Sequence, residues 1–228
     1  MFFEGISSGN SALAGQAVSL LLTALVVSAG VQAGIERLSR WALPLLFLLL
    51  VALAVWASTL PGAIEGYRTF LLRWDGRELM NITTIRNAFS QAFFSIGTGI
   101  GSIMAYSAYL NRKAPVPQEA VSVVGLDTAV GLLAGMLTFP VVISFGLGDA
   151  VSESTIGTIF LALPTGLASI GTTGRIVAVA FFFLAYLAAI TSSVSLLEVP
   201  VASLMDRWNW SRTRATWISA AVIFVIGL

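Results

Sequence analysis

Long uncharged apolar runs dominate this sequence, and they constrain its fold more than any other feature. The run over residues 41–60 contains no charged side chain, and neither does the run over 176–197. A segment of about 20 apolar residues is long enough to cross the hydrocarbon core of a bilayer as one helix. Only 10% of the residues are charged, against about 25% in soluble domains. The sequence therefore predicts an all-α polytopic membrane protein and excludes a water-soluble fold.

Two residue types are missing from the sequence, and their absence limits which kinds of active site and metal site the chain can form. The 228 residues include no Cys and no His, which removes disulfides, thiolate nucleophiles, the usual triad base and the usual zinc ligands. The net charge of +1 gives no basic surface for nucleic acid. The first residues, MFFEGISSGN, lack the positive n-region of a cleavable signal peptide. We therefore expect no enzyme activity, no cofactor and no nucleic-acid partner.

The apolar runs predict a single membrane domain over residues 1–228. We expect six spans, at about 12–34, 41–60, 88–110, 120–147, 175–200 and 215–228. The segment 154–174 is also apolar, but Pro164 stands near its centre among several Gly and Thr residues. Proline and glycine both disfavour a straight helix. This composition favours an extracellular, re-entrant-like hairpin of two short helices over a seventh span.

Basic residues in the loops predict the orientation. Under the six-span arrangement, the turns 35–40, 111–119 and 201–214 share one side and carry seven of the twelve Lys and Arg residues. Short loops rich in Lys and Arg face the cytoplasm, which places the N-terminus outside. Trp41, Trp208 and Trp210 adjoin these turns, as interfacial aromatic residues do.

A glycine-rich sequence, FFSIGTGIGS at residues 93–102, interrupts the third run. Gly97, Gly99 and Gly101 each cost roughly 1 kcal/mol relative to Ala inside a helix, so we predict a break there. Broken backbone persists in a membrane only where it is buried in protein or lines a cavity, and its freed N–H and C=O groups can then bind ligands. The alternative is that Gly97 and Gly101 form a GxxxG helix-packing face.

A group of small oxygen-bearing residues lies in the fifth run. Ala188, Thr191 and Ser192 are spaced i, i+3 and i+4, so they share one helix face. One carbonyl and two hydroxyls there form an oxygen cluster without formal charge, which suits Na⁺ better than Ca²⁺, because Ca²⁺ usually takes carboxylates. The alternative is that the hydroxyls bond back to the preceding turn of their own helix.

Asp127 lies inside the fourth run, and an ionisable group within a span indicates a functional site. No Lys or Arg lies inside the apolar runs, so we expect its partner to be a cation, a proton or a group outside this chain. The alternative is a solvated position near the interface. Glu198 and Asp206 follow the fifth run. Contact with water easily accounts for a charged side chain at Asp206, but less easily for one at Glu198.

Taken together, these segments resemble the neurotransmitter:sodium symporter family. The similar segments follow the family's order: GIER (34–37) with LP (43–44) for the turn between its fourth and fifth helices, FFSIGTGIG (93–101) for the unwound sixth, GLDTAVGLLAG (125–135) for the seventh, TIFLALP (158–164) for an extracellular hairpin, and AAITSSVSLLE (188–198) for the eighth. The resemblance implies part of a LeuT-like inverted-repeat transporter, spanning helices four to nine.

The resemblance also implies roles for individual residues. The implied sodium ligands are Ala188, Thr191 and Ser192 for one ion, and Ser95 and Asp127 for a second. The implied substrate contacts lie along the sixth and eighth helices: Phe94, Gly97, Thr98, Gly99, Ile100, Ser193 and Leu196. Phe94 would be an aromatic lid, and the pocket wall that it forms with Ile100 and Leu196 favours an apolar or aromatic side chain. Tyr109 and Asp206 would belong to the cytoplasmic gate.

The function implied is sodium-coupled symport of an amino acid, or of a related small amine-containing solute, by alternating access in a bacterial inner membrane. The family's first three helices have no counterpart in these residues. We therefore expect the chain to carry half of each site and to act with a missing N-terminal half or with a second copy as a homodimer. The alternatives are a non-transporting membrane scaffold or truncated remnant, inactive alone, and a split transporter completed by another polypeptide. Asp127, where many members have Asn, also predicts transport without chloride.

Overall fold

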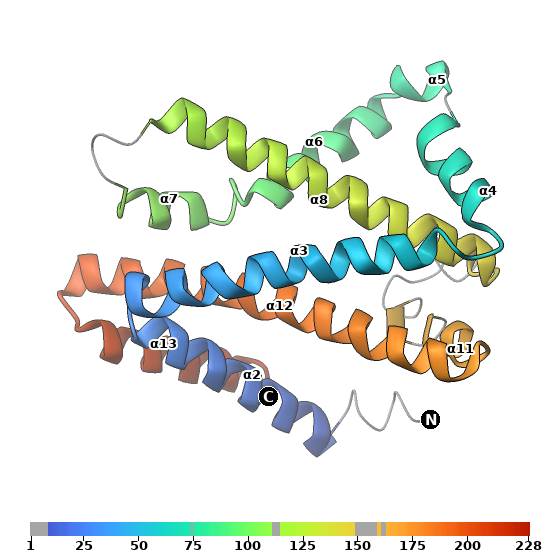
Figure 1. The fold of residues 1–228 in the computed structure, drawn as a ribbon. Coiled ribbons are helices and arrows are strands. Elements are labelled where there is room, and N and C mark those ends of the chain that lie inside the picture. Colours follow the sequence, from blue (N-terminus) through green and yellow to red (C-terminus); the bar gives the residue numbers. More distant parts are fainter. Residues whose placement is uncertain (1–8, 74, 111–114, 149–158, 161–162) are drawn as a thin grey trace. The chain divides into compact units, whose positions relative to one another are not determined.

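The computed structural model describes residues 9–73, 75–110, 115–148, 159–160 and 163–228. Every regular element in these ranges is a helix (Figure 1), which confirms the all-α prediction for this part of the chain. The elements, in chain order, are α2 (Gly9–Ser28), η1 (Val31–Glu36), α3 (Arg37–Ala57), α4 (Ala63–Tyr67), η2 (Arg68–Leu72), α5 (Gly76–Leu79), α6 (Ile82–Ile96), α7 (Ser102–Ser107), α8 (Val116–Ser144), α11 (Leu163–Ala168), α12 (Gly171–Trp208) and α13 (Arg212–Ile226).

Four helical segments of the described ranges are long and apolar enough to cross a membrane. They are Gly9–Ser28, Val31–Ala57, Val116–Ser144 and Gly171–Trp208. The predicted spans 88–110 and 215–228 fall on shorter helices, because α6 and α13 have 15 residues each and α7 has six. The six-span count therefore stays a prediction.

The first turn lies earlier in the chain than predicted. We placed a charged turn at residues 35–40, after a span over 12–34, but α2 ends at Ser28 and Gly30 follows with φ of 99°. Glycine adopts such a φ readily and commonly ends helices. The charged residues instead lie within helix: Glu36 and Arg40 form an exposed ion pair of 2.8 Å at the i, i+4 spacing, an arrangement that supports a helix.

The predicted hairpin at 154–174 falls partly outside the described residues, namely at 154–158 and 161–162. Within the described part, α11 is one short helix, and Pro164 occupies its second residue, where the missing N–H costs no helical bond. Residues 171–174 belong to α12. The two-helix hairpin stays a prediction.

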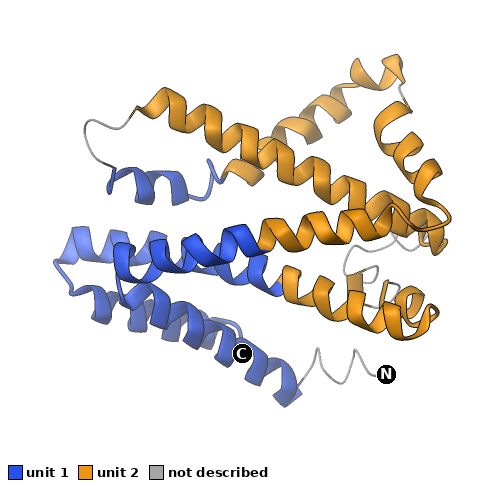
Figure 2. Ribbon diagram, viewed as in Figure 1, with its two compact units in different colours: residues 1–45, 97–114, 186–228 blue, residues 46–96, 115–185 orange. Residues whose placement is uncertain are grey.

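The chain folds into two compact units, each built from segments far apart in sequence (Figure 2). Unit 1 comprises residues 1–45, 97–114 and 186–228, and unit 2 comprises residues 46–96 and 115–185. This division does not test the prediction of a single membrane domain over residues 1–228, which stays a prediction.

In unit 1, α2 and α13 pack against each other. The buried core of this unit is made of small and branched side chains: Ala24, Val27, Ile35, Val194, Leu197, Val201, Ala215 and Ala220. Small side chains such as Ala let helices approach closely, a common device in membrane proteins.

In unit 2, the short helix α4 packs closely against the C-terminal half of α8. A Cβ placed on Gly66 would lie 2.6 Å from the backbone nitrogen of Pro140, so only glycine fits there. The Gly62 N–H donates a hydrogen bond of 3.0 Å to the Ser144 hydroxyl. The buried core of this unit is apolar: Leu50, Leu53, Ala54, Ala57, Leu137, Val141, Leu163, Leu167, Val177 and Leu184.

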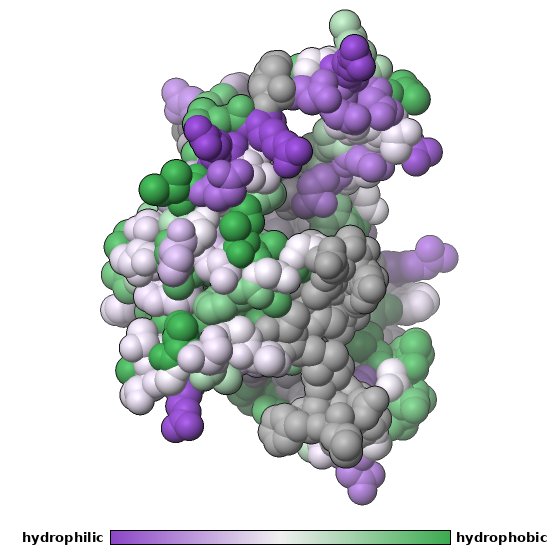
Figure 3. Space-filling model, turned by 90° about the vertical axis from the view of Figure 1, so that its right-hand side faces the viewer, coloured by the Kyte–Doolittle hydropathy of each residue, from purple (hydrophilic) through white to green (hydrophobic). Residues whose placement is uncertain are grey.

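Many large apolar side chains remain at the surface, as Figure 3 shows in green. Leu48, Phe89, Leu126 and Val179 are each more than 60% exposed. Such exposure is rare on soluble monomers and suits helices that face lipid or other helices.

Candidate functional site

The glycine-rich sequence forms a break between two helices. α6 ends at Ile96, α7 begins at Ser102, and both Gly97 and Gly101 adopt left-handed φ angles, of 76° and 85°. A bond of 3.3 Å from the N–H of Ile100 to the carbonyl of Gly97 closes the turn. A side chain at either glycine would strain the backbone. The structure thus has a break where the sequence predicted one, and Thr98 and Gly99 are exposed within it.

Ser95, in the last turn of α6, meets Asp127 of α8 inside unit 2. The Ser95 hydroxyl donates a hydrogen bond of 2.6 Å to Oδ1 of Asp127, a length typical of hydroxyl–carboxylate bonds. Our expectation that the partner of Asp127 is an ion, a proton or a group outside the chain was therefore incomplete, because we had searched the spans only for Lys and Arg. The fold brings together two residues implied as ligands of one ion.

Ala188, Thr191 and Ser192 lie on α12 within unit 1. The Thr191 hydroxyl donates to two carbonyls of the preceding turn, that of Leu187 at 3.0 Å and that of Ala188 at 2.9 Å. Ser193 bonds back in the same way, at 2.9 Å from the Ala189 carbonyl. The structure therefore places the Ala188 carbonyl and the Thr191 hydroxyl next to each other, as the implied sodium site requires. These same hydrogen bonds also fit the alternative, in which the hydroxyls only bond back to the preceding turn of their own helix.

The implied substrate contacts are divided between the two units. Phe94 belongs to unit 2, whereas Gly97, Thr98, Gly99, Ile100, Ser193 and Leu196 belong to unit 1. Phe94 is 69% exposed and Leu196 is 49% exposed, so both side chains are free to contact another molecule. The complete pocket stays a prediction.

The two implied gate residues lie near each other in unit 1. Tyr109 and Asp206 line the same open groove, together with Gly101, Met104 and Val199. Asp206 is exposed, as solvation predicts. The side chain of Tyr109 is held by a charged partner, because its hydroxyl donates a hydrogen bond of 2.8 Å to Oε1 of Glu198.

Among the described residues, Glu198 is the one acid that is buried, and sequence reasoning gave it no role. Its side chain is fully buried, with Oε2 2.8 Å from Nη1 of Arg212 and Oε1 2.8 Å from Nη2. Arg212 also donates 2.9 Å to the Tyr109 hydroxyl and 3.2 Å to the carbonyl of Val27. This bidentate geometry is the strongest form of Arg–carboxylate pairing.

The pairing keeps Arg212 charged. The hydrogen bond to Glu198 raises the pKa of the Arg212 guanidinium, and the same carboxylate adds a favourable charge interaction. Two features of the sequence could have indicated this pair. Glu198 directly follows an apolar run, where a charge is difficult to solvate, and Arg212 lies 14 residues later, after a short turn.

A model of the Sodium:neurotransmitter symporter family matches residues 4–228. The chain is 36% identical to the "Uncharacterized sodium-dependent transporter YhdH" of Bacillus subtilis, over 100% of this chain and 49% of that protein. It is 33% identical to an uncharacterized sodium-dependent transporter of Methanocaldococcus jannaschii, over 97% of this chain and 47% of that protein. The chain thus spans about half the length of these relatives.

A solved structure shares the fold. The crystal structure of MhsT in complex with L-phenylalanine superimposes with a TM-score of 0.84 at 42% sequence identity. The match covers 99% of this chain and 50% of the MhsT chain. A likeness at this identity extends beyond the fold to the sequence itself.

Proposed function

The chain belongs to the sodium:neurotransmitter symporter family, and from this premise we propose that it takes part in sodium-coupled symport of an amino acid or a related small amine-containing solute. Transport proceeds by alternating access, with Na⁺ as the coupling ion, in the inner membrane of a bacterium. The family is one of transporters, and the four long apolar helices of the described residues suit residence in a bilayer.

The pairing of Ser95 with Asp127 carries the proposal. A hydroxyl and a carboxylate 2.6 Å apart, both exposed, offer a cation two adjacent oxygen ligands, one of them charged. In our proposal Na⁺ binds between them and displaces the hydroxyl proton from its bond to the carboxylate. The second ion binds at Ala188, Thr191 and Ser192, where a carbonyl and a hydroxyl lie 2.9 Å apart.

The substrate, in this proposal, binds to the broken helix. The exposed backbone at Thr98 and Gly99 supplies polar groups for the charged ends of an amino acid. Phe94, Ile100 and Leu196 supply apolar contacts, so we propose an apolar or aromatic side chain. The phenylalanine bound to MhsT is a ligand of the same class and supports this choice.

We further propose that this chain carries half of each site. It matches 49% of its Bacillus relative, and the remaining ligands would come from helices of the family that these residues do not include. A missing N-terminal half or a second copy of the chain would supply them. Reconstituted alone in liposomes, the 228-residue chain should show no sodium-driven uptake of phenylalanine, and robust uptake would contradict the half-site proposal.

Sodium binding by the chain provides the direct test. Na⁺, compared with K⁺ at equal ionic strength, should raise the thermal unfolding temperature of the purified protein, and Asp127→Asn should remove most of that rise. Glu119→Gln is the matched control, since Glu119 is an exposed acid in the first turn of the same helix. Equal responses of both variants to Na⁺ would rule out Asp127 as a ligand and favour a non-transporting scaffold.

Asp127 also bears on anion dependence. A carboxylate at this position supplies negative charge beside the proposed sodium site, so we propose that transport does not require chloride. In a complete transporter assembled around this chain, Asp127→Ser should make uptake chloride-dependent. A requirement for chloride before substitution would contradict the idea.

A further inference from the structure

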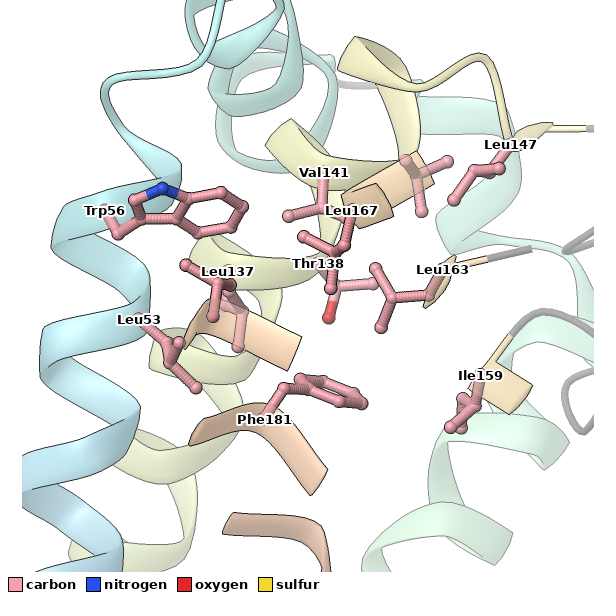
Figure 4. A pocket seen from close by; sticks show the side chains of 12 residues that line it. Leu53, Trp56, Leu137, Thr138, Val141, Leu147, Ile159, Leu163, Leu167 and Phe181 are labelled. Atoms are coloured by element: carbon pink, nitrogen blue, oxygen red, sulfur yellow. The ribbon is translucent and has the colours of Figure 1, made fainter. Parts of the chain in front are cut away.

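An apolar, partly open cavity lies in unit 2, and none of the residues implied in sodium and substrate binding lines it. Its volume is about 200 Å³. Figure 4 shows it where α3, α8, α11 and α12 come together. Its lining comes from these four helices and the segments beside them: Leu53, Trp56, Leu137, Thr138, Val141, Val142, Leu147, Ile159, Leu163, Leu167, Val177 and Phe181.

The lining selects against polar ligands. No charged side chain contributes to it, and only Thr138 and Trp56 carry a polar side-chain atom. The indole nitrogen of Trp56 lies on the edge of the ring turned away from Phe181 and Leu163, so the apolar part of the ring faces the cavity (Figure 4). A charged or strongly polar molecule would lose its hydration here with almost no hydrogen bond in return.

The walls of the cavity are fixed by the core of the unit. Leu53, Leu137, Leu163 and Leu167 are each at most 8% exposed and belong to the buried cluster of unit 2. Protein interiors are close-packed, with few voids larger than a water molecule. An apolar cavity of about 150 Å³ lined by Leu, Ile and Phe stays dry and binds benzene or xenon. The cavity of unit 2 has a comparable volume and a similarly apolar lining, but it is partly open to the surface.

We propose that this cavity is a binding site for one small uncharged apolar molecule, of the size of benzene or of the end of a hydrocarbon chain. The ligand contacts four helices at once, including α11 of the segment predicted as the extracellular hairpin, and so fastens α11 to the rest of unit 2. Two sources share this chemistry, namely free apolar molecules and lipid acyl chains. The proposal does not depend on the transport function, because no implied sodium or substrate residue lines the cavity.

Binding is tested first with benzene as the probe. The full chain, carrying labelled Leu and Val methyl groups, is titrated in detergent micelles and followed by NMR. Methyl signals of Leu53, Leu163 and Val177 should shift and saturate, whereas those of Val194 and Leu197 in the core of unit 1 should not. Absent shifts, or equal shifts in both cores, would overturn the proposal.

Filling the cavity is the second test. Leu167→Phe should weaken benzene binding at least about tenfold, which corresponds to about 1.4 kcal/mol. Leu132→Phe is the matched control, because Leu132 is 47% exposed on α8, and it should bind as the original chain does. Should Leu167→Phe fail to fold, Val142→Thr adds a hydroxyl to a half-buried position of the lining and should weaken binding severalfold. Unchanged affinity in the folded lining variants would refute the site.

The source of the ligand is decided in nanodiscs. Nuclear Overhauser contacts between the terminal methyl of an acyl chain and the methyl of Leu163 would identify the bilayer as the source. Benzene shifts without such contacts would identify free apolar molecules, and both results support the site. The absence of both in the folded chain would overturn it.

Discussion

Each of the two units contains an acid within an apolar helix, and the two acids differ in burial and in their hydrogen-bond partners. In unit 1, Glu198 is fully buried and receives bonds from Arg212 and Tyr109. In unit 2, Asp127 is exposed and receives one bond, from the Ser95 hydroxyl. The first acid has its charge balanced within its own unit. The second keeps its charge available to another partner.

This difference separates a structural acid from a candidate ligand-binding one. A buried ion pair is strongly coupled to folding, because removal of either partner leaves an uncompensated charge. An exposed acid with one hydroxyl partner contributes little to folding and can exchange that partner for a cation. Unit 2 also contains a close contact that can be tested, that of Gly66 with the backbone of Pro140.

Replacement of Glu198 should have the largest effect. Glu198→Gln leaves the guanidinium of Arg212, which is 16% exposed, without its counter-charge, and should lower the free energy of unfolding by about 3–5 kcal/mol. Denaturant unfolding in detergent micelles measures this loss. Glu36→Gln removes an exposed ion pair of equal length and should change stability by less than about 1 kcal/mol. Similar losses in the two variants would remove the distinction between the units' acids.

The packing of unit 2 provides a second, smaller test. Gly66→Ala places a methyl group against the backbone of Pro140 and should cost about 1–3 kcal/mol through displacement of α4 from α8. Gly125→Ala is the control, because a Cβ there meets no atom within 4 Å, and the helix should gain up to about 1 kcal/mol. Thermal unfolding of both variants checks the sign, and a stable Gly66→Ala protein would show that the contact is not tight.

Removal of the Tyr109 hydroxyl tests how far the carboxylate of Glu198 depends on its third bond. Tyr109→Phe deletes that bond and the bond that the hydroxyl accepts from Nη2 of Arg212. It leaves both bonds between Glu198 and Arg212, so we expect a loss of about 0.5–1.5 kcal/mol per deleted bond. Tyr186→Phe, at an exposed tyrosine of α12, should be neutral. A loss as large as that of Glu198→Gln would mean that Tyr109, rather than Arg212, holds the acid.

The smallest change in stability is expected at Asp127. Asp127→Asn retains an oxygen that accepts the Ser95 hydroxyl, and the site is exposed, so the free energy of unfolding without sodium should change by no more than about 0.5 kcal/mol. The same denaturant measurement in choline medium checks it. A loss of several kcal/mol would place Asp127 with Glu198 among the structural acids.

Local features of the fold were predictable where one residue type decides the backbone. Three glycines in five residues indicated the break between α6 and α7, and the structure places left-handed backbone at Gly97 and Gly101. The first turn was misplaced because charge suggested a loop at 35–40, whereas Gly30 ends the helix. A helix tolerates Glu36 and Arg40 at its surface, so charge alone does not mark a turn.

The partners of the acids depend on tertiary packing, and sequence patterns do not encode them directly. Ser95 and Asp127 are 32 residues apart, and Tyr109 and Glu198 are 89 apart. Helical periodicity places a residue on a face, but it does not say which helix passes that face. The role of Glu198 was missed for this reason, although its awkward position after an apolar run was visible.

The bonds of Glu198 have a consequence for biosynthesis. Tyr109 precedes the acid by 89 residues, but Arg212 follows it by 14. At synthesis rates of about 5–20 residues per second, the chain carries an unneutralised carboxylate within α12 for roughly one to three seconds before its counter-charge is made. Insertion of α12 and α13 as a pair, rather than one after the other, would bring the acid and the guanidinium into the bilayer already joined.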